Sequence, residues 1–285
     1  MIRIDSHHHL WQYNTEDYGW IPDEMSVLRR DFLPEDLKVE IDKANIDKVI
    51  TVQARQCLKE TDWLLSLADK YSFIGGITGW LPIQSDNFAS ILEKYIDFPK
   101  LKALRHVVQD EPDDWFLMHP KFLNGVKQIM KTRLLYEILI FERQLPAAID
   151  FVNELPDDHV LVLDHIAKPL IKKGEKEPWA SRLRELAKHE NVYCKLSGLV
   201  TEADLKNWTF SNLQPYMEIV LEIFGANRVM FGSDWPVCTS ATTYSEWVKC
   251  VSQAIEHFSE NEQKLIMGGN TVKIYGVNNN ESICD

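Results

Sequence analysis

Short β-rich runs alternate with longer amphipathic stretches from one end of the 285-residue chain to the other. The stretches repeat apolar residues at helical spacing, whereas the runs are rich in β-branched and aromatic residues. Some runs, such as Val160-Leu161-Val162-Leu163, are apolar throughout, which is typical of a parallel sheet covered on both faces. Eight strands are predicted, at residues 2–9, 48–53, 73–81, 101–108, 134–140, 160–166, 192–197 and 228–235. The pattern therefore predicts repeated βα units.

Repeated βα units form either a closed barrel or an open doubly wound sheet. The open sheet often carries a G-x-G-x-x-G turn after its first strand, and no such turn follows residues 2–9. The length suits a single barrel, because α/β barrels run to about 250 residues or more as one domain. We predict an α/β fold with one (β/α)8 TIM barrel over residues 1–277 and a flexible tail at residues 278–285.

The charge balance narrows the class of partner. Acidic residues outnumber basic ones by 43 to 31, a net charge of −12, which disfavours electrostatic binding to nucleic acid or to an anionic membrane. The five cysteines are odd in number and form no C-x-x-C pair, so neither a disulfide framework nor a thiolate zinc site is expected. The start of the chain lacks an apolar leader. We expect a cytoplasmic protein with a small-molecule partner.

The first motif is Asp5-Ser6-His7-His8-His9-Leu10-Trp11, at the end of the first predicted strand. Side chains alternate along a strand, so His7 and His9 point together into the barrel mouth while His8 points outward. Two imidazoles on one face can share a cation. The alternatives, a tag remnant or two core histidines, fit less well because the triplet is embedded in a strand pattern at a barrel's functional end.

Two further motifs end later strands. Asp164-His165 follows an apolar run. Two interpretations carry equal weight: His165 is a metal ligand or proton carrier, or Asp164 is a cap and His165 is only its neighbour. Asp234, in Gly232-Ser233-Asp234-Trp235-Pro236, would face His7 and His9 across the barrel and could act as a general base, its alternative role being a turn cap. Asp5 and Asp164 are candidate acceptors that fix histidine tautomers.

Rim positions provide candidates for substrate binding. Arg105 can bind a carboxylate or polarise a carbonyl, and Lys195 could do the same, although a partly exposed lysine at a strand end is more often a salt-bridge partner. Aromatic faces suit sugar rings. Long loops at residues 11–30 and 107–120 follow strand ends and are candidate lids or specificity walls; the alternative, which we prefer for the acidic Asp113-Asp114, is a solvated insertion. The predicted substrate-binding residues are Trp11, Gln53, Arg105, His106, Lys195 and Trp235.

Taken in order, these motifs closely resemble the sugar-acid lactonase branch of the amidohydrolase superfamily, the fuconolactonase and rhamnonolactonase-like proteins. The resemblance spans nearly the whole chain. It implies a distorted barrel that hydrolyses sugar lactones such as L-fucono-, L-rhamnono- or galactonolactone, with His7, His9, His165 and Asp234 as catalytic residues and as ligands of any bound metal. The lysine that bridges two metals elsewhere in the superfamily has no counterpart, since Glu137 stands in the fifth strand. One divalent cation such as Zn²⁺, or none, is therefore expected, with no organic cofactor.

The mechanism that follows is attack of water on the ring ester. Asp234 would deprotonate the water, and the histidines or a cation would stabilise the oxyanion. Two alternatives stay open: a mononuclear-metal decarboxylase or hydratase of the same superfamily, and a non-catalytic sugar-acid binder. Assembly into a homo-oligomer is compatible with the sequence, which does not specify the sugar.

Overall fold

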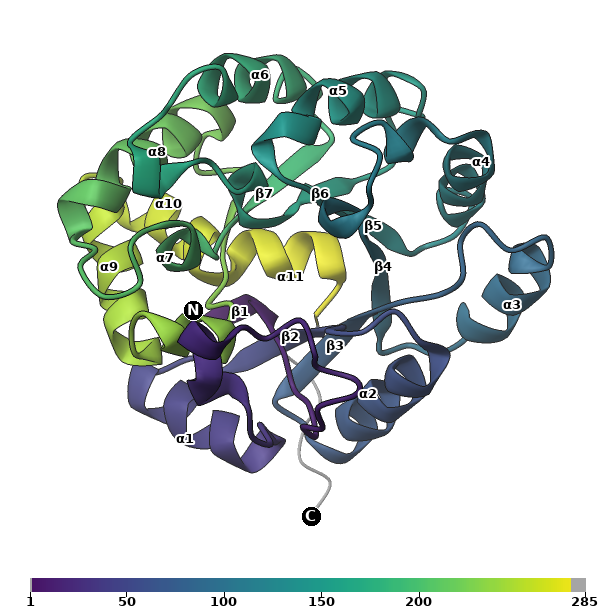
Figure 1. Ribbon diagram of the computed structural model, residues 1–285, viewed down its shortest axis with the longest axis horizontal. Coiled ribbons are helices and arrows are strands. Elements are labelled where there is room, and N and C mark those ends of the chain that lie inside the picture. The colour runs from purple at the N-terminus through teal and green to yellow at the C-terminus, as the bar shows by residue number, and fades with distance from the viewer. Residues whose placement is uncertain (1, 278–285) are drawn as a thin grey trace.

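Eight parallel strands run around a barrel in chain order, from β1 to β8 (Figure 1). This computed structural model describes residues 2–277, so the tail predicted at residues 278–285 lies outside the described part of the chain. The predicted (β/α)8 fold is confirmed. The strands are β1 Ile4–His8, β2 Lys48–Val52, β3 Ile74–Gly79, β4 Leu101–Val107, β5 Leu135–Leu139, β6 Leu161–Leu163, β7 Val192–Leu196 and β8 Val229–Phe231.

The barrel closes between its first and last strands through loop backbone. His8 forms a parallel bridge with Trp235, beyond the end of β8. The amide of His9 donates to the carbonyl of Trp235 at 2.6 Å, and the amide of Asp234 donates to the carbonyl of His7 at 2.8 Å. The register of β1 against β2 also shifts between Asp5 and His8. This irregular closure accounts for the distortion that was expected.

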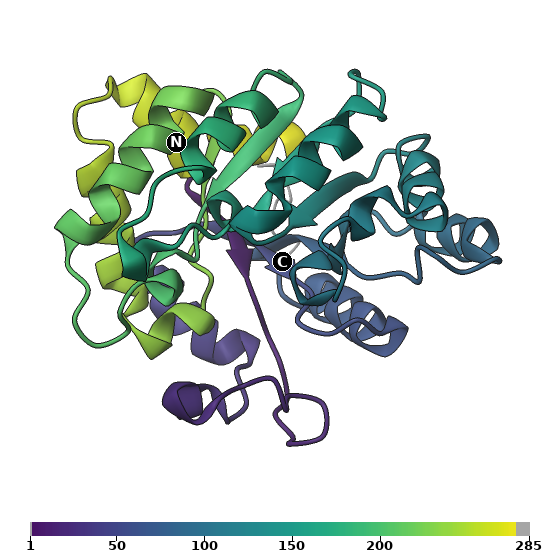
Figure 2. The same ribbon diagram turned by 45° about the horizontal axis from the view of Figure 1, so that its top comes forward.

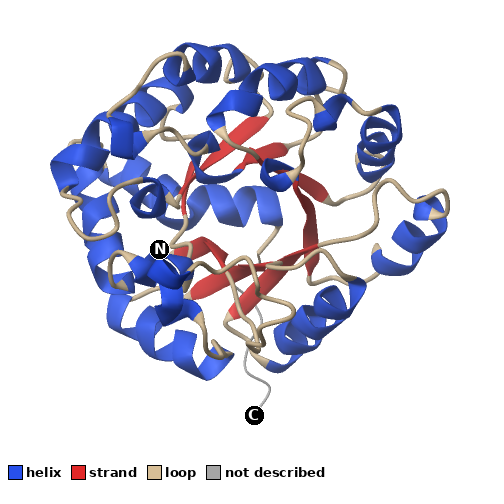
Figure 3. Cartoon of the chain, viewed as in Figure 1, coloured by secondary structure: helices blue, strands red, loops and turns tan. Residues whose placement is uncertain are grey.

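Helices surround the strands as an outer ring, which Figure 3 shows in blue around the red barrel. The longer ones bury an apolar stripe; in α9, for example, Trp247 and Val251 are buried, and Thr243 caps the first turn. The longer helices are α1 Pro34–Ala44, α2 Leu58–Lys70, α3 Phe88–Tyr95, α4 Pro120–Ile129, α5 Leu145–Asn153, α6 Trp179–Leu186, α8 Phe210–Phe224 and α9 Tyr244–Ala254. The shorter ones are η1 Asp23–Leu28, η2 Val108–Asp110, η3 Phe116–Met118, η4 Glu142–Gln144, η5 Asp164–Ala167, η6 Ile171–Lys173, α7 Leu199–Glu202, η7 Val237–Ser240, α10 Glu260–Lys264, η8 Leu265–Gly269 and α11 Asn270–Tyr275.

The end of the barrel away from the carboxyl ends of the strands is filled by apolar side chains. Figure 1 shows α11 lying across the ring of strands. Seven strands contribute to this cluster, which we call the apolar plug: Ile4, Ile50, Ala103, Leu135, Val162, Tyr193, Met230, Tyr275 and Val277. Layers of inward side chains of this kind make a barrel interior a packed core.

All eight strands are shorter than the predicted ranges, and two of them end three or more residues early. β6 ends at Leu163 rather than at residue 166, and β8 ends at Phe231 rather than at residue 235. The cause is backbone conformation, because φ is 52° at His165 and 56° at Asp234, in the left-handed region that a strand does not allow. The three residues after His165 also have positive φ. The predicted extensions of these two strands are therefore wrong, and a strained turn takes the place of each.

Long segments follow β1 and β4, as predicted. The segment after β1 extends well beyond the strands in Figure 2 and is tied back by an antiparallel bridge between Trp11 and Phe32. In the segment after β4, Asp113 pairs with His119 and Asp114 with Arg143, all at the surface. Within residues 2–277, the helices are too short or too polar to cross a membrane.

Candidate active site

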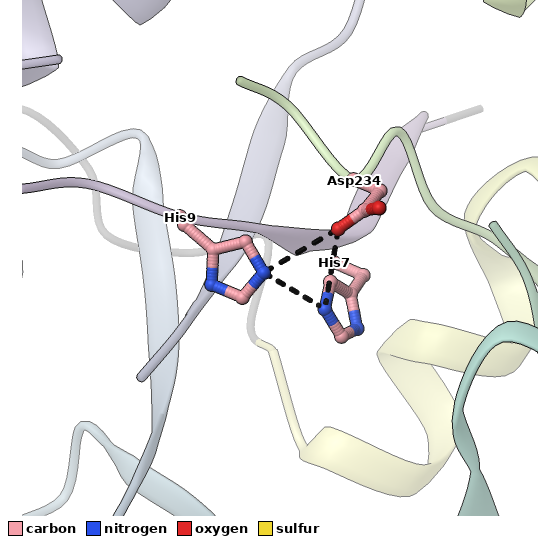
Figure 4. A group of neighbouring side chains, drawn as sticks. All are labelled: His7, His9 and Asp234. Atoms are coloured by element: carbon pink, nitrogen blue, oxygen red, sulfur yellow. Dashed lines mark hydrogen bonds and ion pairs between the residues drawn. The ribbon is translucent and has the colours of Figure 1, made fainter. Parts of the chain in front are cut away.

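His7, His9 and Asp234 meet at the barrel mouth, the end formed by the carboxyl ends of the strands (Figure 4). His7 belongs to β1, His9 follows it directly, and Asp234 lies in the turn after β8. The two Nε2 atoms are 3.3 Å apart, and Oδ1 of Asp234 is 3.4 Å from Nε2 of His9 and 3.9 Å from Nε2 of His7. The structure thus brings together the pair and the carboxylate that the sequence placed across the barrel.

A backbone hydrogen bond determines the tautomer of His9. Its Nδ1 lies 2.8 Å from the carbonyl oxygen of Val52, which can only accept, so Nδ1 carries the proton. Nε2 of His9 therefore presents a lone pair toward His7 and Asp234. A carbonyl behind a histidine is the usual arrangement when the other nitrogen serves as a ligand or an acceptor.

His165 reaches the same site from the left-handed turn after β6. Its Nδ1 is 2.9 Å from the hydroxyl of Ser197, and its Nε2 is 3.9 Å from Oδ1 of Asp234. Gly198 makes room for the ring: φ there is +71°, and a Cβ atom would lie 2.5 Å from Nδ1 of His165. A larger residue at this position would displace the imidazole.

Four charged side chains, the buried ion network, lie beneath the histidines: Arg105, Glu137, Asp164 and Lys195. Arg105 Nη1 is 2.9 Å from Asp164, and Lys195 Nζ is 2.6 Å from Glu137 and 3.1 Å from Asp164. Two cations and two carboxylates balance the charge of this interior, as buried ions require. Lys195 is fully buried, so the expectation of a partly exposed lysine is wrong.

Asp5 differs from its expected role. It accepts hydrogen bonds from the backbone amide and the hydroxyl of Ser233, at 2.8 and 2.5 Å, and from the hydroxyl of Tyr244. It therefore anchors the turn that carries Asp234 rather than the ring of a histidine. Burial raises the pKa of Asp5 to about 6, against the lowering effect of these donors. Asp164 does face an imidazole, at 3.4 Å from Nδ1 of His7.

The ionisation of the mouth suits general-base chemistry. Burial alone would raise the pKa of Asp234, but the nearby His165 and His9 hold it below its usual range. Burial lowers the pKa of His165 to about 4 and that of His7 well below its ordinary 6.5. At neutral pH the site therefore holds a carboxylate beside uncharged imidazoles, which can accept or relay protons.

A cavity of about 560 Å³ opens over these groups. Five of the predicted site residues line it: His9, Trp11, Arg105, His165 and Asp234. Both long loops contribute to its wall, as predicted. Residues that the sequence argument did not single out for the site also line it, among them Glu16, Asp17, Arg55, Lys168 and Glu202. All of these follow the ends of strands, which is the signal that could have identified them.

The other predicted substrate-binding residues lie behind the cavity lining. Gln53 is fully buried and accepts Nη2 of Arg105 at its backbone oxygen. The side chain of His106 forms hydrogen bonds with those of Trp80 and Glu111. Trp235 packs edge-on against Phe32 beneath a separate outer groove. Lys195 lies in the buried ion network. These four positions support the wall and floor rather than forming the surface of the cavity.

The cavity wall after β2 is held by one carboxylate. Glu60, in the first turn of α2, accepts the backbone amides of Ala54 and Arg55 at 3.0 and 2.8 Å. Its second oxygen, Oε1, is buried without a hydrogen-bond partner among the described residues. Burial raises the pKa of Glu60 to about 7. Arg55 in turn forms an ion pair with Asp17 in the loop after β1.

The spacing of the mouth residues fits one divalent cation. Zinc bonds of about 2.0–2.2 Å in a tetrahedron place ligand atoms about 3.3–3.6 Å apart. Nε2 of His7, Nε2 of His9 and Oδ1 of Asp234 are separated by 3.3, 3.4 and 3.9 Å, and the lone pair on His9 already points inward. His7, Asp164 and His165 form a second, overlapping group of candidate ligand atoms.

Known proteins share this sequence and architecture. The chain is 37% identical to an L-fucono-1,5-lactonase of Burkholderia multivorans, over 97% of this chain and 96% of that protein. It is 32% identical to an L-fucono-1,5-lactonase of Burkholderia ambifaria, with the same two coverages. A crystal structure of an amidohydrolase from Burkholderia multivorans with bound zinc superposes with a TM-score of 0.92, at 37% identity, covering 98% of this chain and all of that one.

The family assignment agrees with the geometry. The sequence model of the amidohydrolase family matches residues 4–277, which includes every strand of the barrel and every residue described at its mouth. The eight-stranded barrel, the paired histidines of β1 and the carboxylate after β8 are the features on which the resemblance rested. The chain belongs to the amidohydrolase family.

Proposed function

We propose that this protein hydrolyses the ring ester of a sugar-acid lactone to the free acid. The observation that carries the proposal is a carboxylate, Asp234, whose pKa lies below its usual range and which is set among three histidines at the cavity. Relatives over nearly the full length are L-fucono-1,5-lactonases, which supports an aldonolactone as the substrate class.

The carboxylate and its neighbour place the attacking water. Oδ1 of Asp234 and the lone pair of His9 Nε2, 3.4 Å apart, both accept, so they orient a water molecule with its protons directed toward them. Asp234 takes one proton as the water oxygen bonds to the ring carbonyl carbon, and the π electron pair of the carbonyl moves to its oxygen, which becomes an oxyanion. The oxyanion then re-forms the carbonyl as the bond from carbon to ring oxygen breaks. The proton held by Asp234 passes to the ring oxygen, which becomes an alcohol.

The oxyanion needs a hydrogen-bond donor on the side of the substrate away from Asp234. Arg105 lines the cavity. Its guanidinium is permanently charged, and N–H donors of this kind stabilise an oxyanion. Asp164 fixes the other end of the guanidinium at 2.9 Å. We assign Arg105 to the oxyanion, where such donors contribute about 3 kcal/mol to the barrier.

A divalent cation fits the same floor. His7, His9 and Asp234 would hold it, with His165 beside them. When bound, it would polarise the carbonyl and lower the pKa of water.

The cavity walls are suited to a polyhydroxylated ring. Trp20 provides an exposed aromatic face, and the charged Asp17, Arg55 and Glu202 can pair with hydroxyl groups. A volume of about 560 Å³ lies within the range typical of small-ligand cavities. The homo-oligomeric state and cytoplasmic location expected from the sequence stay predictions.

The test is proton release from a panel of aldonolactones, followed with a pH indicator. The wild-type protein, Asp234→Asn and the surface control Asp113→Asn are each assayed after chelator treatment, with and without added Zn²⁺. Rapid hydrolysis lost only in Asp234→Asn supports the proposal. Release of carbon dioxide from aromatic acids without turnover of any lactone would instead favour the decarboxylase alternative.

A further inference from the structure

A lysine and a glutamate form a loose ion pair in the cavity wall. Nζ of Lys168 lies 3.8 Å from Oε1 of Glu202, the two side chains are 16% and 21% exposed, and both residues line the cavity. That separation is longer than a hydrogen bond. Among residues 2–277, neither side chain forms a hydrogen bond. The pair therefore leaves a charged donor and a charged acceptor available to water or to a ligand.

The ion pair in the wall after β2 is different. Nη2 of Arg55 and Oδ1 of Asp17 form a direct hydrogen bond, and Oδ2 of Asp17 accepts a second one from Asn14 at 2.7 Å. Both oxygens of this carboxylate are thus engaged with protein donors. Of these two ion pairs lining the cavity, the one formed by Lys168 and Glu202 is the open one.

Both members of the open pair belong to segments that hold His165. Lys168 follows η5, and its amide donates to the carbonyl of His165 at 2.8 Å. Glu202 ends α7, which begins directly after Gly198, the residue that makes room for the imidazole. The charge of Asp234 also reaches the pair: burial raises the pKa of Glu202, Lys168 opposes the rise, and Asp234 adds to it. The pair therefore lies on the side of the mouth where Asp234 and His165 meet.

A neutral hydroxyl group matches such a pair. Its oxygen can accept from the ammonium while its proton is donated to the carboxylate. An oxygen about 2.8 Å from each charged atom fits a gap of 3.8 Å. The pair has no net charge, so an anionic group would be attracted by one member and repelled by the other. Both bonds to a hydroxyl are charge-assisted, which makes them stronger than bonds between neutral groups.

We propose that Lys168 and Glu202 bind one substrate hydroxyl, the one on the carbon next to the reacting carbonyl, and so determine which lactones are hydrolysed. The inference rests on the proposed function. The carbonyl carbon must lie over the water held by Asp234 and His9. Its two ring neighbours are the ring oxygen and a carbon, and only the carbon bears a hydroxyl. This hydroxyl is therefore the first that a charged pair beside Asp234 can reach.

A pair of lactones that differ in this one hydroxyl tests the assignment. The substrates are the aldonolactone that the wild-type protein hydrolyses fastest and its 2-deoxy counterpart. The double variant Lys168→Met with Glu202→Leu removes both polar groups without changing the net charge. Its matched control is Lys127→Met with Glu154→Leu, which removes a lysine–glutamate pair 3.4 Å apart outside the cavity lining. Circular dichroism confirms that each variant is folded.

The measured quantity is the ratio of kcat/KM for the hydroxylated lactone to kcat/KM for the 2-deoxy lactone. We expect this ratio to be about 10- to 100-fold lower in the double variant, the range for hydrogen bonds to charged groups. The value for the 2-deoxy lactone should stay within about threefold of the wild type, and the control should keep both wild-type values. Comparing one ratio between proteins cancels any difference in the intrinsic reactivity of the two lactones.

An unchanged ratio in the folded double variant would overturn the inference, and so would an equal loss on both lactones, which is the sign of a merely structural role. If the double variant does not fold, the single variants Glu202→Leu and Lys168→Met decide, because each should lower the same ratio. A wild-type protein that hydrolyses no lactone would refute the proposed function and this inference with it. An active wild type with an unaffected ratio in the variants would refute this inference alone.

Discussion

The two ends of the barrel interior differ in composition, because one is apolar and the other is polar and charged. The apolar plug contains inward side chains from seven strands and is covered by α11. The mouth contains buried carboxylates, imidazoles and cations, and its backbone adopts left-handed φ at His165 and Asp234. Burying unpaired polar groups and straining backbone both cost stability. The packed end therefore stabilises a barrel whose other end is shaped for chemistry.

The largest effect should come from the carboxylate of the mouth. Asp234→Asn removes the proposed general base but keeps the shape and most hydrogen bonds of the side chain. We expect kcat/KM for lactone hydrolysis to fall about 10³-fold, within the range typical of general-base loss, while the melting temperature changes by only a few degrees. Steady-state kinetics and calorimetry measure the two quantities. A large loss of stability with little loss of activity would contradict the assignment of chemistry to the mouth and of stability to the apolar plug.

A substitution in the apolar plug should lower stability and leave activity almost unchanged. Ile50→Ala leaves a hole in the apolar plug and should lower the free energy of unfolding by about 2–5 kcal/mol, as large-to-small changes in cores do. Urea denaturation measures this loss. Because Ile50 is remote from the cavity lining, kcat of the remaining folded protein should stay within about twofold of the wild type. A collapse of kcat would show that the two ends are coupled.

The mouth should also make stability depend on pH. The pKa of Glu60 is about 7 in the folded protein and 4.5 ordinarily, so the folded state retains a proton that the unfolded state has released. This contribution is fully present below pH 4.5 and is lost as the pH rises through 7, a loss of about 3 kcal/mol. Glu60→Gln should remove it, flattening the unfolding free energy across this window. The exposed Glu222→Gln serves as control; equal slopes in all three proteins would contradict the assignment.

The smallest effect is expected at the outer wall. Trp20 is 48% exposed, lines the cavity and contacts Trp11 edge-on. Trp20→Ala should raise KM about tenfold, equivalent to about 1.4 kcal/mol, with kcat little changed, because it removes ring contact without touching the reacting groups. Trp115 is equally exposed but lies outside the cavity lining, so Trp115→Ala is a matched control. Equal KM values would exclude Trp20 from the substrate surface.

The sequence was sufficient for the barrel and for the residues that meet at its mouth. Alternation of strands and helices has a period that can be counted, and strand ends share one edge of a parallel sheet, which is why His7, His9, His165 and Asp234 could be placed together. The resemblance to the amidohydrolases is confirmed by the family match.

Two predictions failed, one on the backbone conformation after β6 and one on the burial of Lys195. A run such as Leu163-Asp164-His165-Ile166 has strand propensity, and nothing in its composition reveals the left-handed turn that ends β6. The burial of Lys195 also escaped prediction, since its partner Glu137 is 58 positions away and only the closed barrel brings the two together. Local patterns do not contain such distant pairings.

The irregular closure of the barrel has a consequence for synthesis on the ribosome. Ser233, whose amide and hydroxyl bind Asp5, lies 228 positions from it, and Asp234 meets His7 across the same join. A chain made from its amino end thus carries His7 and His9 long before their carboxylate exists. We expect nascent and carboxyl-truncated chains to be inactive however well their first strands pair, because activity begins only when the last strand joins the first.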